Sequence, residues 1–342
     1  MKKEKKLVLS IILALVLVLF IISNVNAGID VSLTGNLGNP SMYGAYAGVV
    51  SSMTEQLSSV WNAGSKLTAD AFSIANYQTP LVGEAKISDF TLGLMFSPTL
   101  AVKASSISSN MKDTLGAAKG GAMNLGLIFG FSLHKNVDMV IHGIYFPKTK
   151  WIKQLEKFEI YGGGVTFRFK LIGEALVAGT GFQGLVLSVS GGYSHMKLSH
   201  SQSLNQSANF EYLGAPGVIA FNTFDGTAKL NTYYAGVDLK VYFQILWFLY
   251  IYAGAGVIYN HATIKVDSEG YATSIFMGYV NSGSVIISGD DKSNHFIPQI
   301  MAGICFNVLG FLKIPFQVSM TWSPKSEKTP IWNLTGGVRF DF

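Results

Sequence analysis

The feature that most constrains this sequence is an alternation of apolar and polar residues with period two, which returns in segment after segment. In LKIPFQVSMTW (residues 312–322), Leu312, Phe316 and Val318 alternate with Lys313 and Gln317. Successive side chains of a strand point to opposite faces of a sheet, so this segment has one apolar and one polar face. The same pattern occurs at residues 123–134, 165–170, 237–245 and 332–342. The sequence therefore predicts an all-β fold.

The alternating segments predict about ten antiparallel strands, with ten to twelve as the range. We place them at residues 86–101, 122–133, 137–146, 157–170, 182–198, 230–245, 249–264, 294–307, 311–322 and 332–342. Short connections are expected at 134–136, 246–247 and 309–310, and long polar loops at 103–121, 199–230, 265–292 and 323–331. Because an antiparallel chain reverses at each connection, all the long loops lie at one end of the sheet.

The strands have the length that a lipid bilayer requires. An eleven-residue strand rises about 3.3 Å per residue and, tilted by about 40°, crosses nearly the whole apolar band, roughly 25 Å tall, of a membrane barrel. Lipid requires every backbone polar group to be paired, so the sheet must close, with its apolar face outward. We therefore predict a transmembrane antiparallel β-barrel over residues 85–342. A secreted soluble β-sandwich, which shares the alternation, is the alternative.

The first 27 residues indicate export. Four lysines precede the apolar run at residues 7–22, which is followed by the small-residue site Val25-Asn26-Ala27. This is the pattern of a cleaved signal peptide, with an uncleaved anchor as the alternative. The single cysteine, Cys305, leaves no internal disulfide and no lipoprotein acylation site near residue 27.

Composition excludes several classes of function. Without residues 1–27, 21 basic and 19 acidic residues remain of the original 25 and 20, because that segment holds four lysines and one glutamate. A net charge of +2 with only two arginines, Arg168 and Arg339, predicts no nucleic-acid partner. We expect no cofactor and no metal.

The last strand resembles the terminal strand of bacterial outer-membrane β-barrel proteins, which ends in Phe after alternating apolar residues. Val338, Phe340 and Phe342 match that signature. The resemblance implies an outer-membrane location and recognition of these residues by the barrel assembly machinery, with outer-membrane lipid as the surrounding partner.

Residues 28–84 form a separate N-terminal segment. Within residues 42–77, Tyr46, Leu57, Trp61 and Ile74 belong to an apolar stripe with helical spacing. The helix either packs at the periplasmic mouth of the barrel or plugs its lumen, and because a helix is about 10 Å across, we expect a plugged barrel to need more strands. The run Gly44–Gly48 is faintly similar to the N-terminal hatch of long-chain fatty-acid channels.

Charged residues on the polar strand faces are expected to point into the lumen and to pair there. These predicted lumen-facing charges are Arg168, Lys170, Asp238, Lys240, Lys313, Arg339 and Asp341. At the predicted outer rim, His195, His200, Asp290, Asp291 and His295 are either solvated loop residues or a metal or Asp–His site, as in the ten-stranded omptin proteases.

A narrow barrel with long outer loops predicts a non-enzymatic surface protein. We expect adhesin-like contact with external partners through the loops 199–230 and 265–292. The alternative is a passive conduit for small or hydrophobic solutes that is gated by the N-terminal segment.

Overall fold

The computed structural model describes residues 29–38, 46, 51, 66–101, 120–149, 157–177, 180–212, 214–324 and 329–342. The predicted signal peptide and the hatch-like run, apart from Tyr46, lie outside these residues. The predicted loop 103–121 lies outside them as well, except for its last two positions.

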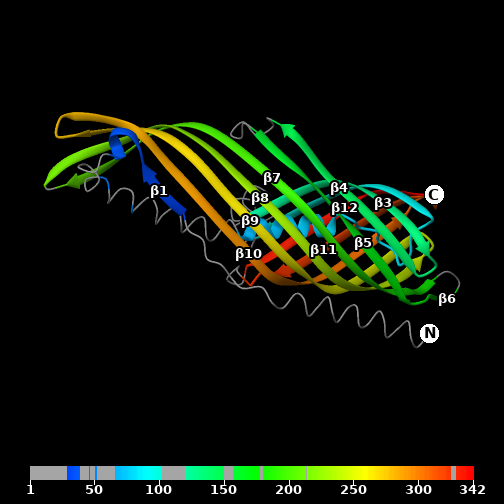
Figure 1. Ribbon diagram of the computed structural model, residues 1–342. Helices are drawn as coiled ribbons and strands as arrows, with labels where there is room; N and C mark the ends of the chain where they lie inside the picture. The colour runs from blue at the N-terminus through cyan, green and yellow to red at the C-terminus, as the bar shows by residue number, and fades with distance from the viewer. Residues whose placement is uncertain are drawn as a thin grey trace.

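Ten antiparallel strands close into a barrel (Figure 1). Neighbours along the chain pair with each other, and β12 pairs with β2 to complete the ring. The predicted strand number is therefore confirmed. The ring strands are β2 (Phe90–Ala101), β3 (Gly120–His134), β4 (Val137–Thr149), β5 (Lys157–Ile172), β7 (Thr180–Tyr212), β8 (Ala215–Leu246), β9 (Leu249–Phe276), β10 (Tyr279–Asn307), β11 (Leu312–Trp322) and β12 (Pro330–Asp341).

Three short elements stand outside this ring. Strand β1 (Ile29–Leu33) pairs with β10, and the 3-10 helix η1 (Gly35–Gly38) follows it. Strand β6 (Ala175–Val177) pairs with the start of β7. None of the three was predicted from the sequence, because each is too short to show a periodic pattern.

The exposure of the strands matches the predicted orientation of their two faces. In β12, Leu334, Val338 and Phe340 are exposed, while Asn333 and Thr335 are buried. A soluble barrel would bury the apolar side chains, so this arrangement is that of a transmembrane β-barrel. Among the described residues, no helix is long and apolar enough to cross a membrane, a finding that does not concern strands.

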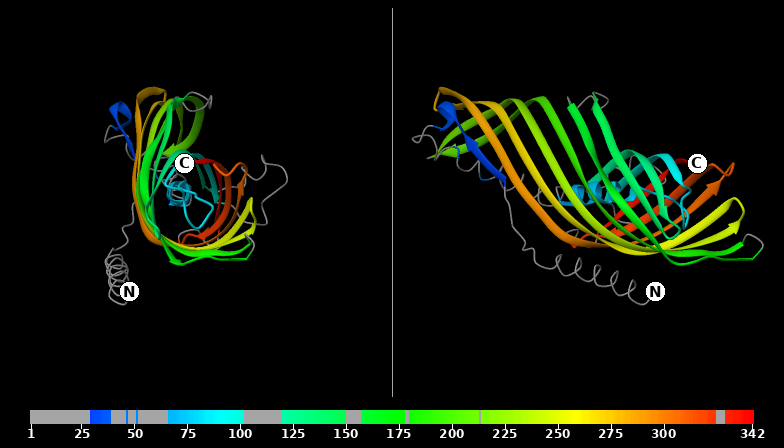
Figure 2. Two further views of the ribbon diagram at one scale, coloured as in Figure 1. Left: turned by 90° about the vertical axis from the view of Figure 1, so that its right-hand side faces the viewer. Right: turned by 45° about the vertical axis from the view of Figure 1, so that its right-hand side comes forward.

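A helix over residues 66–78 lies inside the barrel (Figure 2). All of its residues from Ala69 to Gln78 are buried. The segment 79–89 continues from the helix along the lumen to the start of β2, with Leu81 and Val82 buried against the inner wall. Residues 66–89 therefore lie in the lumen as a plug and not at the mouth of the barrel, whereas residues 29–38 lie along β10.

The expectation that a lumen helix requires more than ten strands is also wrong, because small residues on both surfaces make room. The helix presents Ala69, Ala71 and Ala75. On the wall, Gly236 lies directly under the ring of Tyr77, and a Cβ at Gly126 would stand 2.5 Å from the Thr79 methyl group. The helix backbone can therefore approach the wall more closely than side chains of ordinary size would allow.

Strands β7 to β10 continue far beyond the closed ring. They contain 28 to 33 residues each, whereas β11 pairs with β10 only along Gln299–Asn307. Their distal parts form a curved sheet with β1 at one edge, which we call the extension (Figures 1 and 2). The prediction of irregular loops at 199–230 and 265–292 is therefore wrong, because both segments are paired strands joined by tight turns.

The fit between Gly236 and Tyr77 gives a direct test of the plug. In the variant Gly236→Ala, the new methyl group collides with the ring of Tyr77. This ring cannot easily move away, because the Tyr77 hydroxyl donates a hydrogen bond to Asp238. We expect a loss of about 1–3 kcal/mol in the free energy of unfolding, as for other overpacked interiors. Urea unfolding of the refolded barrel measures this loss. The matched control is Gly143→Ala, where no atom lies within 4 Å of the new Cβ, and an equal loss in both variants would contradict the packing.

Candidate functional site: the plugged lumen and the extension tip

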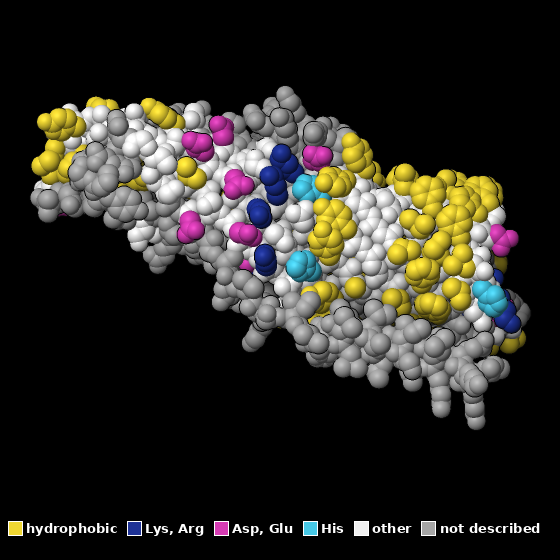
Figure 3. Space-filling model, in the orientation of Figure 1, with side chains coloured by type: hydrophobic (Ala, Val, Ile, Leu, Met, Phe, Trp, Pro, Cys, Tyr) yellow, Lys and Arg dark blue, Asp and Glu magenta, His cyan; other side chains and the backbone are white. Residues whose placement is uncertain are grey.

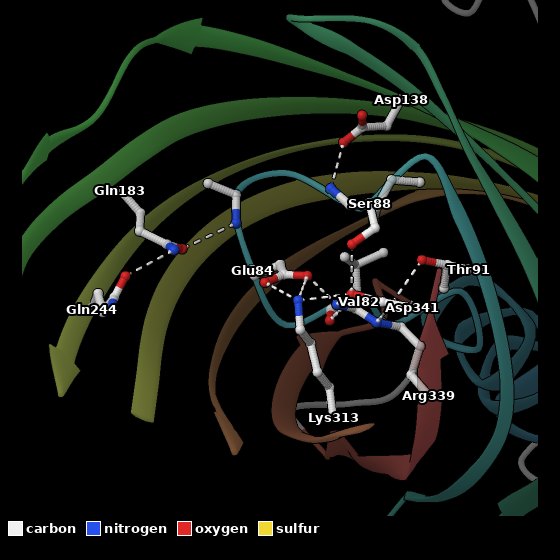
Figure 4. Close-up of polar contacts among 12 residues, drawn as sticks. Val82, Glu84, Ser88, Thr91, Asp138, Gln183, Gln244, Lys313, Arg339 and Asp341 are labelled. Atoms are coloured by element: carbon white, nitrogen blue, oxygen red, sulfur yellow. Dashed lines mark hydrogen bonds and ion pairs between the residues drawn. The ribbon is translucent and has the colours of Figure 1, made fainter. Parts of the chain in front are cut away.

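The charged residues of the lumen form a cluster at the end of the barrel where the chain ends (Figure 4). Lys313 of β11 and Arg339 of β12 stand directly opposite each other in the sheet register, and both are buried. Two like charges directly opposite each other repel, and nearby anions are needed to offset that repulsion. Glu84 from the plug and Asp341 from β12 supply those anions.

Glu84 receives the most contacts in this cluster. The Nζ of Lys313 donates to both of its carboxylate oxygens, at 2.6 and 2.7 Å, and Arg339 also donates to it. Asp341 lies 2.7 Å from the same Nζ and accepts a hydrogen bond from Thr91 at 2.8 Å. The cluster therefore pairs two cations with two anions and ties the plug to β11 and β12.

Arg168 of β5 holds the plug from the other side of the lumen. It pairs with Asp138 of β4 at 3.2 Å and donates to the backbone carbonyl of Glu84. Arg339 donates in the same way to the carbonyl of Val82. Backbone carbonyls of an irregular segment need such donors when they are buried, so these two arginines fix the path of residues 82–84.

The remaining predicted lumen charges have nearby partners. Lys240 lies 3.4 Å from Asp238 on the same strand, and Asp238 accepts the hydroxyl hydrogen of Tyr77 at 2.7 Å. Lys170 is 4.0 Å from Glu174. The structure thus places all seven predicted charges in ion pairs. Five of them contact the plug directly: Arg168, Asp238, Lys313, Arg339 and Asp341.

Uncharged polar side chains hold the helix to the wall along its length. The Oδ1 of Asn76 accepts a hydrogen bond from Nε2 of His142 at 2.8 Å, and the Tyr234 hydroxyl lies 3.2 Å from the same ring nitrogen. Gln78 donates to Gln299 at 2.6 Å. Each bond satisfies a polar group that the plug has removed from water, as a buried interior requires.

The predicted rim cluster is divided between the two faces of the sheet. Asp291 and His295 point inward, where Asp291 pairs with Lys66 at 3.6 Å and His295 bonds Asp70 at 2.9 Å. Asp290 points outward and is exposed. The interpretation of these residues as solvated loop positions is wrong, because they lie within β10. Among the described residues, no three His, Cys, Asp or Glu side chains are placed to hold a metal ion.

The two predicted rim histidines lie elsewhere. His195 packs against Tyr161 on the outer face of the barrel and bonds Asn231 at 2.7 Å. The side chain of His200 lies outside the described residues. In the described part of the chain, His195 therefore bonds an amide and no carboxylate.

A small cavity lies in the lumen beside the plug. Its volume is about 20 Å³, and it lies between residues 77–82 and the inner faces of β5, β7 and β8. That volume holds about one water molecule.

The tip of the extension exposes apolar side chains far from the closed barrel. Met277, Tyr279 and Val280 are 66%, 75% and 67% exposed. Met277 has a φ of 49° and Gly278 a φ of 80°, which is a two-residue turn of type I′. Asn or Gly normally occupies the first of these positions, so a methionine there is strained. A groove of about 830 Å³ beside this turn is lined by residues of both distal hairpins.

The residues of the assembly signature lie on the outer surface. Val338, Phe340 and Phe342 are all exposed, and the Phe342 ring lies 6.0 Å from that of Phe90.

Removing the central anion of the lumen cluster should weaken the whole barrel. In Glu84→Gln, Lys313 and Arg339 lose a buried carboxylate, and we expect a loss of about 3 kcal/mol or more in the free energy of unfolding. Urea unfolding measures this loss. The control Glu174→Gln removes an exposed carboxylate and should change stability by less than about 0.5 kcal/mol. Similar values for the two variants would refute the anchoring role of Glu84.

Comparison with solved structures finds distant similarities to bacterial β-barrels. Neisserial surface protein A is 10% identical, with 75% of this chain and 98% of that chain covered and a TM-score of 0.28. The translocator domain of the autotransporter NalP from Neisseria meningitidis is 9% identical, with 82% and 99% covered and a TM-score of 0.32. A Pseudomonas aeruginosa FadL homologue is 10% identical, with 81% and 98% covered and a TM-score of 0.25. Similarities this distant do not assign a function.

The comparison with curated proteins gave no match. A family model described as Lsa36-like matches residues 45–341, which include the lumen helix and the whole strand ring. The chain therefore belongs to the Lsa36-like family.

Proposed function

We propose that this chain is a non-enzymatic surface protein of the bacterial outer membrane, whose extension contacts external macromolecules in the manner of an adhesin. The observation that carries the proposal is the exposed apolar tip formed by Met277, Tyr279 and Val280. Soluble surfaces rarely gather large apolar side chains, and where they do, the patch usually binds a partner.

The orientation follows from the barrel. The closed end holds short turns and the C-terminal residue, which in outer-membrane barrels lie on the periplasmic side. The extension leaves the opposite end, so it projects into the external medium. Its backbone hydrogen bonds hold the tip at a fixed distance from the membrane surface, which suits a binding surface.

The strained turn supports a role for the tip. A positive φ at a non-glycine residue costs free energy, and it persists where the side chain serves another purpose. Met277 keeps its flexible apolar side chain exposed at such a position. Together with the groove beside it, the turn offers a concave and adaptable apolar surface.

The alternative is a passive conduit for small or hydrophobic solutes. Its support is the placement of a helix in the lumen, where a gate would stand. The dense bonding of that helix to the wall, from Asp70 to Glu84, favours a permanent seal over a gate.

A change at the turn separates binding from folding. In Met277→Asn, the turn gains the residue that type I′ geometry favours, so thermal stability should be unchanged or higher. Binding of the purified protein to cultured mammalian cell layers should fall roughly fivefold or more, as expected on loss of a central apolar contact. The control Asp225→Asn alters an exposed residue of the same extension away from the tip. Full binding by Met277→Asn would refute the role of this turn.

Conductance distinguishes the seal from the conduit. The refolded barrel should show no open steps in a planar lipid bilayer, because the described lumen is filled. Deleting residues 42–77 removes the helix and should produce reproducible steps. A heat-dependent shift in electrophoretic mobility verifies that each protein has folded. Frequent open steps from the intact chain would favour the conduit.

A further inference from the structure

Three lysines form a row on the outer face of the barrel near its junction with the extension. Lys197 of β7 stands directly opposite Lys229 of β8, which stands directly opposite Lys265 of β9. Figure 3 shows basic side chains gathered across these strands, between the apolar surface of the barrel and a group of acidic side chains. Like charges directly opposite each other destabilise a sheet, so the row needs a source of negative charge.

Carboxylates are found at the two ends of this row. Glu159 of β5 is opposite Lys197 in the register, and Asp290 of β10 lies 3.8 Å from Lys265. Farther along the extension, Asp267 is two residues from Lys265 on the same face. The central Lys229 has lysines on both sides, and no carboxylate within ion-pair distance is found for it among the described residues.

The row lies where the headgroups of a bilayer are expected. Toward the membrane, the rings of Tyr161, His195, Tyr193 and Tyr233 form a belt across β5, β7 and β8. Aromatic belts of this kind mark the boundary between acyl chains and headgroups. Lys229 is four residues beyond Tyr233 on β8, or about 13 Å along the strand, which places its amine among the polar parts of the lipids.

An apolar groove runs along the same strands on the membrane side of the belt. Its volume is about 880 Å³, and it spans the outer faces of β5, β7, β8 and β9. It is hollow because Gly191, Ala235 and Ala255 place small groups at outward positions, while Phe167 and Leu239 are exposed beside it. Because the groove belongs to the surface that faces acyl chains, an acyl chain is the occupant that its position favours.

We propose that the lysine row and this groove together bind one anionic phospholipid of the membrane. The phosphate lies over Lys229, between Lys197 and Lys265, and an acyl chain lies in the groove. Six residues, or about 20 Å along β8, separate Lys229 from Ala235, and the lipid backbone with the first part of its chain crosses that distance over the aromatic belt. The inference goes beyond the surface-binding function and does not depend on it.

Native mass spectrometry of the purified protein in neutral detergent tests this site. The probes are phosphatidylglycerol and phosphatidylcholine with identical acyl chains. The unmodified protein should retain the anionic lipid more tightly, and Lys229→Gln should weaken that binding roughly fivefold while leaving phosphatidylcholine binding unchanged. The control Lys135→Gln removes an exposed lysine at the opposite end of the barrel and should have no effect. Equal retention of the two lipids, or equal behaviour of the two variants, would overturn the proposal.

A groove variant distinguishes a bound lipid from a bound phosphate. Ala235→Phe fills the groove and should weaken the binding of both lipids. If it leaves phosphatidylglycerol binding unchanged, and millimolar inorganic phosphate displaces that lipid, the row binds phosphate alone and the lipid site is overturned.

Thermal unfolding gives a second test that does not depend on counting lipids. Without lipid, Lys229→Gln relieves repulsion within the row and should leave the Tm unchanged or raise it. When phosphatidylglycerol is added, the Tm of this variant should rise less than the Tm of the unmodified protein, because the variant binds the lipid less tightly. A lower Tm in neutral detergent would assign Lys229 a structural role and overturn the proposal.

Discussion

The buried ion cluster around Glu84 is the interaction on which the rest of the barrel depends. Lys313 and Arg339 occupy adjacent positions on the inner wall, and neither can be accommodated there without an anion. Asp341 supplies one of the two negative charges that they require, and the plug supplies the other. The strand ring and the N-terminal segment are therefore parts of a single folded unit, because each contains charges that the other neutralises.

The plug also explains how a ring of ten strands can be filled without becoming wider. Side chains alone fill a smaller barrel, whereas a larger one leaves a channel. Here the lumen helix has alanines on its surface, and on the wall Gly236 lies under the ring of the helix residue Tyr77. Polar side chains from the helix then satisfy the polar inner wall along its length. This packing of the described lumen is why we propose a function for the outer surfaces.

The types of residue on the outer surface change with the surroundings of each part of the molecule. Within the bilayer, outward positions are apolar and carry the groove at Ala235 and Ala255. At the boundary, aromatic rings give way to the row around Lys229. Farther out, on the extension, one face of the sheet is covered, since Ile219, Ala272 and Val285 are buried there. The apolar tip at Met277 belongs to the extension and not to the apolar surface of the closed barrel, which is why we propose that it contacts a partner.

The sequence by itself determined the ring and the direction of its side chains, because period-two alternation is a local property of each strand and the bilayer demands it over a fixed length. It predicted seven inward charges on the strands, including Lys313 and Arg339. It did not identify Glu84 or Asp70 as their plug-side partners, since these residues are distant in sequence and show no periodic signal. It also missed the strands at 199–212 and 265–292, whose polar residues show little alternation and become strands through pairing with their neighbours. The position of the helix in the lumen likewise depends on contacts among segments more than 150 residues apart, such as Tyr77 with Asp238, which only the tertiary structure brings together.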